Sequence, residues 1–490
     1  MNRAILSLLI VAFLTGCAIG PDYKRPIFDT PQAWRVEEKE AQDRANTAWW
    51  HQFEDGVLDG LIDEALKQNN DLRVATARVD EYVGRYWVGR SGLFPQIGAY
   101  GSATRDRASE RGTAPIPSTV PNPSENYQAG FSGSWEIDIW GKLRRATEAS
   151  KAELLGTQEA RQAVILSLVS ATANGYILLR DLDKQLEVAR RTANVREESY
   201  KLFKLRYEGG VISELELNQV KSEYEQALAT IPQIEKQIGF QENALSLLLG
   251  RNPGPIERGK SIDELALPAV PAGLPSDLLE KRPDVRQAEQ ALVAANARIG
   301  VAKAQFFPTI SLTGLFGWAS TELSNLFNGP AQVWSWGGSA AAPIFTGGSL
   351  LGQLWASEAI QQQTLFNYRN AVQNAFREVN DALIDQRRTR EQLEAQKRQV
   401  EALKEYARIA RLRYDNGYTS YIEVLDAERS LFSSELTYAQ TQGTLFGALV
   451  NLYKAMGGGW VVVADRLTSP ETFTARKEDK EEPEDKAKTP

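Results

Sequence analysis

Two kinds of side chain alternate from Tyr127 to Ile137, and a helical pattern follows directly and reaches Arg145. One set is aromatic, aliphatic or small: Tyr127, Ala129, Phe131, Gly133, Trp135 and Ile137. The other set is small or polar: Gln128, Gly130, Ser132, Ser134, Glu136 and Asp138. Alternate residues of a strand lie on opposite faces, so one face can meet lipid while the other meets water. The pattern therefore predicts a membrane β-strand that runs into a helix.

Two further stretches alternate in a similar way, from Gln96 to Thr104 and from Ile310 to Trp318, and a fourth strand is predicted from Val333 to Ile344, where small and aromatic residues lead through glycine into a helix. The loop between the first two predicted strands is long and rich in charge, proline and serine, which suits the outer side of a membrane barrel. The last strand also runs into a helix. We therefore predict two membrane β-hairpins, each continued by a helix.

Two very long helices are predicted, because neither the stretch from Lys142 to Tyr207 nor that from Gly352 to Tyr414 contains a proline. At about 1.5 Å per residue, the first would run close to 100 Å. Its sequence shows a heptad row, with residues seven apart that are mostly apolar or aromatic: Ile165, Thr172, Leu179, Leu186, Ala193, Tyr200 and Tyr207. A companion row contains Leu168, Leu182, Ala189 and Phe203, and Gly175 and Arg196 interrupt it. Each helix therefore needs packing partners along its full length.

A turn follows each long helix, and the two turns have matching sequences. They read Arg206-Tyr207-Glu208-Gly209-Gly210 and Arg413-Tyr414-Asp415-Asn416-Gly417. A Ser-x-x-Glu capping box follows each turn, at Ser213 and at Ser420, and predicts the start of a return helix. Two such matches between long helices indicate an internal duplication. The fold class is therefore mainly α with membrane β, in which a strand pair plus a long helical hairpin occurs twice.

The first residues resemble the leader of a bacterial lipoprotein. Arg3 precedes an apolar run that ends at Leu14, as in a signal peptide. Leu14-Thr15-Gly16-Cys17 resembles a lipobox, although an ordinary signal peptide could also contain a cysteine. We expect lipidation at Cys17, the one cysteine of the chain. No later apolar run is expected to reach the roughly 18 to 20 residues of a transmembrane helix, so strands would have to span the membrane.

Composition argues against several functions. The chain has 490 residues, a net charge of −7 and a pI near 5.3, and no basic cluster with interleaved aromatics predicts a nucleic-acid partner. With His51 as the one histidine, no catalytic Ser-His-Asp or Cys-His set can be assembled. We expect no enzyme activity, no cofactor and no metal site. We also expect the many helical Asp and Glu residues to lie on solvated faces.

The predicted organisation has ten segments. They are a signal peptide (1–16), a lipidated extended segment (17–56), equatorial helices (57–92), the first β-hairpin (93–141), the first long helical hairpin (142–250), a linker (251–275), equatorial helices of the second repeat (276–305), the second β-hairpin (306–345), the second long helical hairpin (346–457) and a C-terminal segment with a disordered charged tail (458–490).

Four strands cannot close into a barrel, because membrane barrels begin at about eight strands and an open edge in lipid leaves backbone groups unpaired. The chain must therefore oligomerise. About eight strands from a dimer would enclose side chains, whereas about twelve from a trimer could leave a lumen. The expected inward residues favour the lumen, because they are small and polar: Gly130, Ser132, Ser134, Thr309, Ser311 and Thr313.

The lipobox, the two strand-to-helix junctions and the paired turns resemble the TolC-like outer membrane factors, in particular the lipoprotein (NodT-type) branch. The resemblance implies a homotrimer with a 12-stranded β-barrel in the outer membrane, continued by a 12-helix α-barrel in the periplasm. It implies docking to a periplasmic adaptor protein and an inner-membrane transporter of the resistance-nodulation-division type. The implied function is a passive exit channel for drugs or other small toxic compounds. A type I protein secretion outlet and a periplasmic adaptor lipoprotein are the alternatives.

The resemblance also implies a gate where the helices converge at the turns. The expected gate residues are Arg206, Tyr207, Arg413, Tyr414, Asp415 and Thr419. Several family members carry a pore-lining aspartate just after the turn glycine. In this chain Thr419 occupies the position where that aspartate is expected, so Asp415 or Glu423 would have to supply the acid. Tyr207 and Tyr414 could instead merely pack between helices. The expected adaptor contacts are the turn residues Gly209, Gly210, Ser213, Asn416, Gly417 and Ser420.

Overall fold

The computed structural model describes residues 18–29, 31, 34, 48–111, 117, 121–270, 278–457 and 461. The chain divides into two compact units. The first unit comprises Met1–Ile27, Val79–Thr157 and Ala288–Tyr368, and the second comprises Phe28–Arg78, Gln158–Gln287 and Arg369–Pro490. The predicted signal peptide, Cys17 and nearly all of the predicted C-terminal tail lie outside the described residues.

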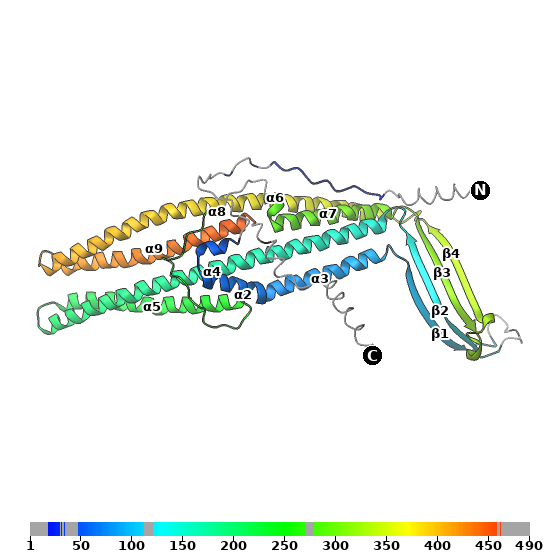
Figure 1. The fold of residues 1–490 in the computed structure, drawn as a ribbon, viewed down its shortest axis with the longest axis horizontal. Helices are drawn as coiled ribbons and strands as arrows, with labels where there is room; N and C mark the ends of the chain where they lie inside the picture. Colours follow the sequence, from blue (N-terminus) through cyan, green and yellow to red (C-terminus); the bar gives the residue numbers. More distant parts are fainter. Residues whose placement is uncertain are drawn as a thin grey trace, which may run out of the picture. The chain divides into compact units, whose positions relative to one another are not determined.

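The first unit contains an antiparallel sheet whose four strands follow the order of the chain, β1-β2-β3-β4 (Figure 1). The strands are β1 (Gln96–Asp106), β2 (Ser124–Ile137), β3 (Thr309–Ser320) and β4 (Gln332–Ala341). All four predicted strands are thus confirmed. β4 ends before the predicted Ile344, because Pro343 interposes a residue that cannot donate a ladder hydrogen bond.

The helices follow the predicted repeat. Short helices are η1 (Trp49–Phe53), α2 (Gly56–Gln68), α3 (Asn70–Ser91), α6 (Leu278–Lys281), α7 (Pro283–Ala304), η3 (Leu323–Asn325) and η4 (Gly329–Ala331). The long helices α4 (Lys142–Glu208) and α8 (Ser349–Asp415) have 67 residues each. Their return helices are α5 (Glu214–Leu248) and α9 (Tyr421–Ala455), and Figure 1 shows each folding back along its long helix. α5 continues through Pro232.

One window of α4 is long and apolar enough to cross a membrane by length and composition, and 56% of that window is buried. The expectation that no such run follows the leader is therefore wrong. Most of the window's apolar residues pack in the helical core, as in the core helix of a soluble protein, and its heptad positions Ile165 and Leu179 are fully buried.

The core of the second unit includes part of the segment that we expected to be extended. Trp49 and Phe53 of η1 are fully buried, because together with Trp50 they form an aromatic cluster that packs against α9. The ring of Trp49 stacks on that of Tyr453, with 5.2 Å between centroids. His51 points away from this core and lies 2.9 Å from Asp59.

The residues that follow Cys17 run across the first unit and are held there by hydrogen bonds and an ion pair. The amide of Ile19 donates to the carbonyl of Trp140 at 3.0 Å, and Asn296 donates to the carbonyl of Pro21 at 2.8 Å. The buried guanidinium of Arg145 lies 2.6 Å from the carboxylate of Asp22. Gly300 of α7 leaves room for this path, because a Cβ atom there would stand 2.7 Å from the carbonyl oxygen of Ile19.

Candidate functional site

The register of the sheet places its apolar side chains on one face. Directly paired residues share a face. Phe131 of β2 pairs with Ala99 of β1 and with Phe316 of β3, which in turn pairs with Trp334 of β4. The predicted alternation along β2 and β3 is therefore confirmed and extends across all four strands.

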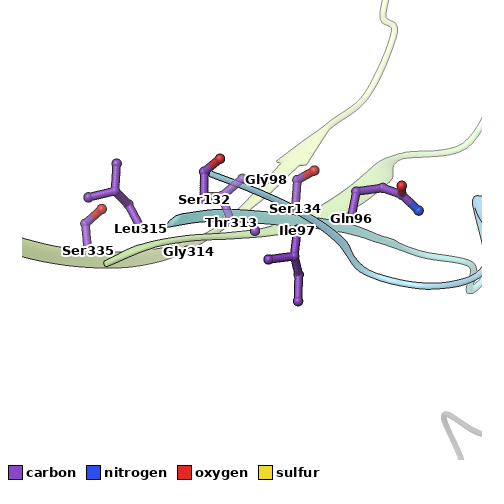
Figure 2. A pocket seen from close by; sticks show the side chains of 10 residues that line it. Gln96, Ile97, Gly98, Ser132, Ser134, Thr313, Gly314, Leu315 and Ser335 are labelled. Carbon is purple, nitrogen blue, oxygen red and sulfur yellow. The ribbon is translucent and has the colours of Figure 1, made fainter. Parts of the chain in front are cut away.

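The opposite face of the sheet is small and polar. Ser132 pairs with Gly98 and with Leu315, and Leu315 pairs with Ser335. Figure 2 shows Ser132 and Ser134 on the side of the sheet away from Ile97. Both serines help to line a hollow of about 590 Å³. The expected inward residues thus share one face, and the larger exceptions on it are Leu315, Val333 and Tyr100.

The apolar face is open to its surroundings in the single chain. Trp336 is 81% exposed and Ile97 is 78% exposed, and Phe131, Phe316 and Trp334 are each more than one third exposed. A contiguous exposed apolar surface of this kind marks a contact with lipid or protein. The sheet can therefore separate a lipid phase from a polar space.

Both outer strands of this sheet have a free edge. β1 pairs with β2 alone and β4 with β3 alone among the described residues. A free edge carries unpaired backbone donors and acceptors, which are costly in lipid. The single chain is therefore an incomplete barrel wall.

The junction between sheet and helix is tightly bonded. Both carboxylate oxygens of Asp138 accept backbone N–H groups of the first turn of α4, from Leu143 and Arg144 at 2.9 Å each. This arrangement satisfies donors that a helix start leaves free. The indole of Trp140 donates to the carbonyl of Pro308 at 2.8 Å and so connects the start of α4 to the start of β3.

The two turns between long helices have the same backbone design. Gly210 and Gly417 adopt positive φ, at 67° and 75°, which glycine tolerates without strain. In the first turn, the amide of Val211 donates to the carbonyl of Arg206 at 2.8 Å. In the second turn, the amide of Tyr418 donates to the carbonyl of Arg413 at 2.9 Å. The predicted duplication is confirmed at these turns.

The two predicted capping boxes differ. Ser213 and Glu216 form both bonds of the first. The second is not formed, because Ser420 makes no side-chain cap bond and the carboxylate of Glu423 is engaged elsewhere. It lies 2.9 Å from Arg413 and accepts the hydroxyl of Thr419.

An aromatic cluster joins the two hairpins beside the turns. The guanidinium of Arg206 donates to the hydroxyl of Tyr414 at 2.8 Å. Tyr414 packs edge-on against Tyr421, with 4.9 Å between ring centroids. The ring centroid of Tyr421 lies 4.2 Å from that of the buried Phe203. We call Phe203, Arg206, Tyr414 and Tyr421 the tip cluster. It unites two of the expected gate residues from different hairpins.

The other expected gate residues lie around the tip cluster. Asp415 lies 3.5 Å from Arg411, one turn earlier on the same helix, and Arg413 and Thr419 share the carboxylate of Glu423. The side chain of Tyr207 is 39% exposed and does not belong to the cluster. No group of three or more His, Cys, Asp or Glu side chains in the described part of the chain is placed to hold a metal ion.

A group of buried charges was not foreseen from the sequence. Arg196 of α4 and Glu223 of α5 are 3% and 8% exposed, and their side chains lie 3.1 Å apart. Arg429 of α9 binds the same carboxylate at 2.6 Å. Burial raises the pKa of the neighbouring carboxyl of Glu428 and lowers the pKa of Arg196. The expectation that helical acids lie on solvated faces is wrong for Glu223, and the available signal was Arg196, a charge within a heptad core row.

Comparison with known proteins gives a family. The sequence model of the family described as "Outer membrane efflux protein" matches residues 61–251 and 274–458, which together are most of the chain. The matched ranges include both helical hairpins and all four strands.

Relatives and solved structures agree with this match. The toluene efflux pump outer membrane protein TtgC of Pseudomonas putida is 36% identical, over 94% of this chain and 96% of its own length. The cation efflux system protein CusC of Escherichia coli is 35% identical, over 93% of this chain and 99% of its own length. The structure of the open state of the MtrE outer membrane channel of Neisseria gonorrhoeae is similar with a TM-score of 0.83 and 33% identity, covering 91% of this chain and 99% of that one.

Proposed function

Because this chain belongs to the outer membrane efflux protein family, we propose that three copies of it form the outer membrane exit channel of a tripartite efflux pump. The chain is an efflux channel of the outer membrane, like its relatives. The periplasmic adaptor alternative is thereby excluded. Beyond the trimer, we propose a lipid anchor, pump partners, a class of cargo and a gate for this channel.

The observation that carries the trimer is the four-stranded sheet with one apolar face, one polar face and two free edges. Pairing β1 of one copy with β4 of the next satisfies both edges and closes a barrel. About twelve strands leave room for a lumen, whereas about eight fill their interior with side chains. The small polar face then lines the conduit, and the apolar face meets lipid.

A lipid anchor at Cys17 is the second part of the proposal. The fitted path of Ile19, Pro21 and Asp22 across the first unit supports it, because this path holds the residues beside Cys17 at the junction of sheet and helix. An acyl chain there would enter the membrane next to the apolar face of the sheet. One lipid alone gives weak anchoring, and the barrel supplies the rest.

The partners are a periplasmic adaptor protein and an inner-membrane transporter of the resistance-nodulation-division type. The exposed turns at Gly209, Gly210 and Ser213, and at Asn416, Gly417 and Ser420, are the proposed adaptor contacts. Cargo consists of drugs or other small toxic compounds, as the toluene and cation pumps of the relatives illustrate. The channel is passive and performs no catalysis; the transporter and the adaptor select the cargo.

The gate is the tip cluster with its neighbours Arg413, Asp415 and Thr419. The bond from Arg206 to Tyr414 is a contact between hairpins, so opening the tip requires that it break. A charge-assisted hydrogen bond of this kind is among the stronger polar contacts. Closing and opening then correspond to two arrangements of the hairpins.

Conductance of the purified oligomer in planar lipid bilayers tests this function. The wild-type channel should pass small, infrequent currents, and Arg206→Ala combined with Tyr414→Ala should raise the open fraction several-fold. Gln363→Ala, at an exposed position of α8, is the control and should leave the current unchanged. Currents that do not differ between wild type and the double variant would remove the gate assignment.

A further inference from the structure

The segment between β3 and β4, residues 321–331, is held together by its own hydrogen bonds. It contains η3 and η4 and lies at the end of the sheet away from α7 (Figure 1). The side-chain amide of Asn325 donates to the carboxylate of Glu322 at 2.6 Å, and that of Asn328 donates to the side-chain oxygen of Asn325 at 3.0 Å. Leu326 is 5% exposed. We call this segment the β3–β4 loop, and its bonds give it a defined shape.

The β3–β4 loop packs on the apolar face of the sheet. The ring of Phe327 meets that of Trp318 edge-on, with 5.5 Å between centroids. Trp318 in turn meets Phe316 with 5.5 Å between centroids. Trp318 and Phe316 are two residues apart on β3, so they share the apolar face. The aromatic row of that face therefore continues beyond the end of the strand into the loop.

Two apolar side chains of the loop remain open to the surroundings. Phe327 is 69% exposed and Leu323 is 63% exposed. Glu322 is the one charged residue of the loop sequence, and Asn325 already binds its carboxylate. Exposed apolar side chains that extend an apolar surface mark a contact with lipid or protein. The loop thus presents such a contact at the end of the sheet where the strands leave the membrane.

Lipid fits this contact better than a second copy of the chain. The loop contacts the sheet through Trp318 of β3, and β3 pairs on both sides with strands of its own chain. A neighbouring copy would join at the free edges of β1 and β4. Phe327 therefore lies over the middle of the apolar wall, whose other exposed side chains meet lipid.

We propose that the β3–β4 loop inserts Leu323 and Phe327 among the acyl chains of the outer leaflet. Aromatic side chains suit this depth, where apolar chains give way to polar headgroups. The loop then widens the apolar band of the barrel and leans away from the polar space. The inference goes beyond the proposed conduit and rests on the assignment of the apolar face to lipid.

The test attaches a small thiol-reactive fluorophore to the full-length oligomer in phospholipid vesicles. Leu323→Cys, Phe327→Cys and Ser109→Cys each add one thiol, and the wild type, with Cys17 as its one cysteine, gives the background. A nitroxide on the lipid acyl chains, near their headgroup end, quenches only fluorophores that it contacts. We expect roughly two-fold stronger quenching at positions 323 and 327 than at 109, because Ser109 lies exposed in the polar connection between β1 and β2.

Phe131→Cys, on the apolar face of β2, is the control for lipid contact, and heat-modifiable oligomer on a gel checks the folding of each variant. Quenching at 131 but no more at 323 and 327 than at 109 would refute the loop insertion and leave the barrel wall intact. Quenching at none of these positions would refute both. Shielding of position 327 from lipid-borne and from water-soluble nitroxides would mean that protein covers the loop, which also overturns the proposal.

Discussion

Asp181 of α4 is 5% exposed and packs against Gly443 of α9. A Cβ atom added at Gly443 would stand 2.9 Å from the Cβ atom of Asp181. Burial raises its pKa from 3.8 to about 6, although Gln185 donates a hydrogen bond to it. The folded protein therefore binds this proton more tightly than the unfolded chain does. Stability rises as the pH falls from about 6 towards 4, and above pH 6 the charged form costs on the order of 3 kcal/mol.

Asp181→Asn removes that cost and keeps an oxygen that can accept the bond from Gln185. We expect the variant to dissociate and unfold at a higher temperature than wild type at pH 7.5, with an advantage on the order of 3 kcal/mol per chain that fades towards pH 4. Thermal unfolding in detergent across this pH range measures it. Asp63→Asn, on an exposed face of α2, is the control. An equal effect of both variants, or an advantage that grows as the pH falls, would contradict the assignment.

Single residues also mark where sequence reasoning reached its limit. The repeat period predicts which positions face the core, and it placed Arg196 in a core row. It does not show which partner makes a buried charge tolerable, because Glu223 and Arg429 come from other helices. The same limit explains the second capping box: Ser420 and Glu423 have the right spacing, but Arg413 and Thr419 compete for the glutamate. Such competition depends on side chains beyond the local motif.

At the scale of elements, the strands and long helices were predictable for clear physical reasons. Strict alternation over β2 and β3 permits one register in which the apolar faces coincide, since a slip by one residue would move every side chain to the other face. Proline-free stretches and turn glycines defined α4 and α8. Trp49 and Trp50 were predicted to lie in an extended segment, whereas they belong to the core. Their partner Tyr453 lies about 400 residues later, and no local pattern connects them.

The two faces of β2 give a prediction with a built-in control. Phe131 and Ser132 are adjacent, yet they lie on the apolar and polar faces. Phe131→Lys should cost roughly 2–4 kcal/mol per chain in the membrane and sharply reduce the amount of heat-modifiable oligomer in outer-membrane fractions. Ser132→Lys places the same charge on the polar face and should assemble normally, with a measurable change in ion selectivity. Equal loss of assembly in both variants would refute the assignment of faces.

The path of the residues after Cys17 depends on the missing side chain of Gly300. Gly300→Ala would place a Cβ 2.7 Å from the carbonyl oxygen of Ile19 and 2.9 Å from the side chain of Arg145. We expect the segment to leave its path and trypsin to cleave after Lys24 several-fold faster, as followed by mass spectrometry. Gly84→Ala is the control, because that position in α3 is open and gains the same helix propensity. Unchanged cleavage in Gly300→Ala would show that the close approach does not hold the segment.

At the scale of the whole molecule, the free edges of β1 and β4 determine how many chains build the channel. Two chains would offer about eight strands and a filled interior, and three would offer about twelve strands and a lumen lined by the polar face. Co-expression of a tagged and an untagged form, followed by electrophoresis without boiling, counts the chains: random mixing in a trimer gives four bands, and in a dimer three. Oligomers that are mixed only after purification should give two bands, because exchange would require breaking the strand pairs between chains. Three bands on co-expression would mean a dimer, and the open lumen that efflux requires would then have to be abandoned.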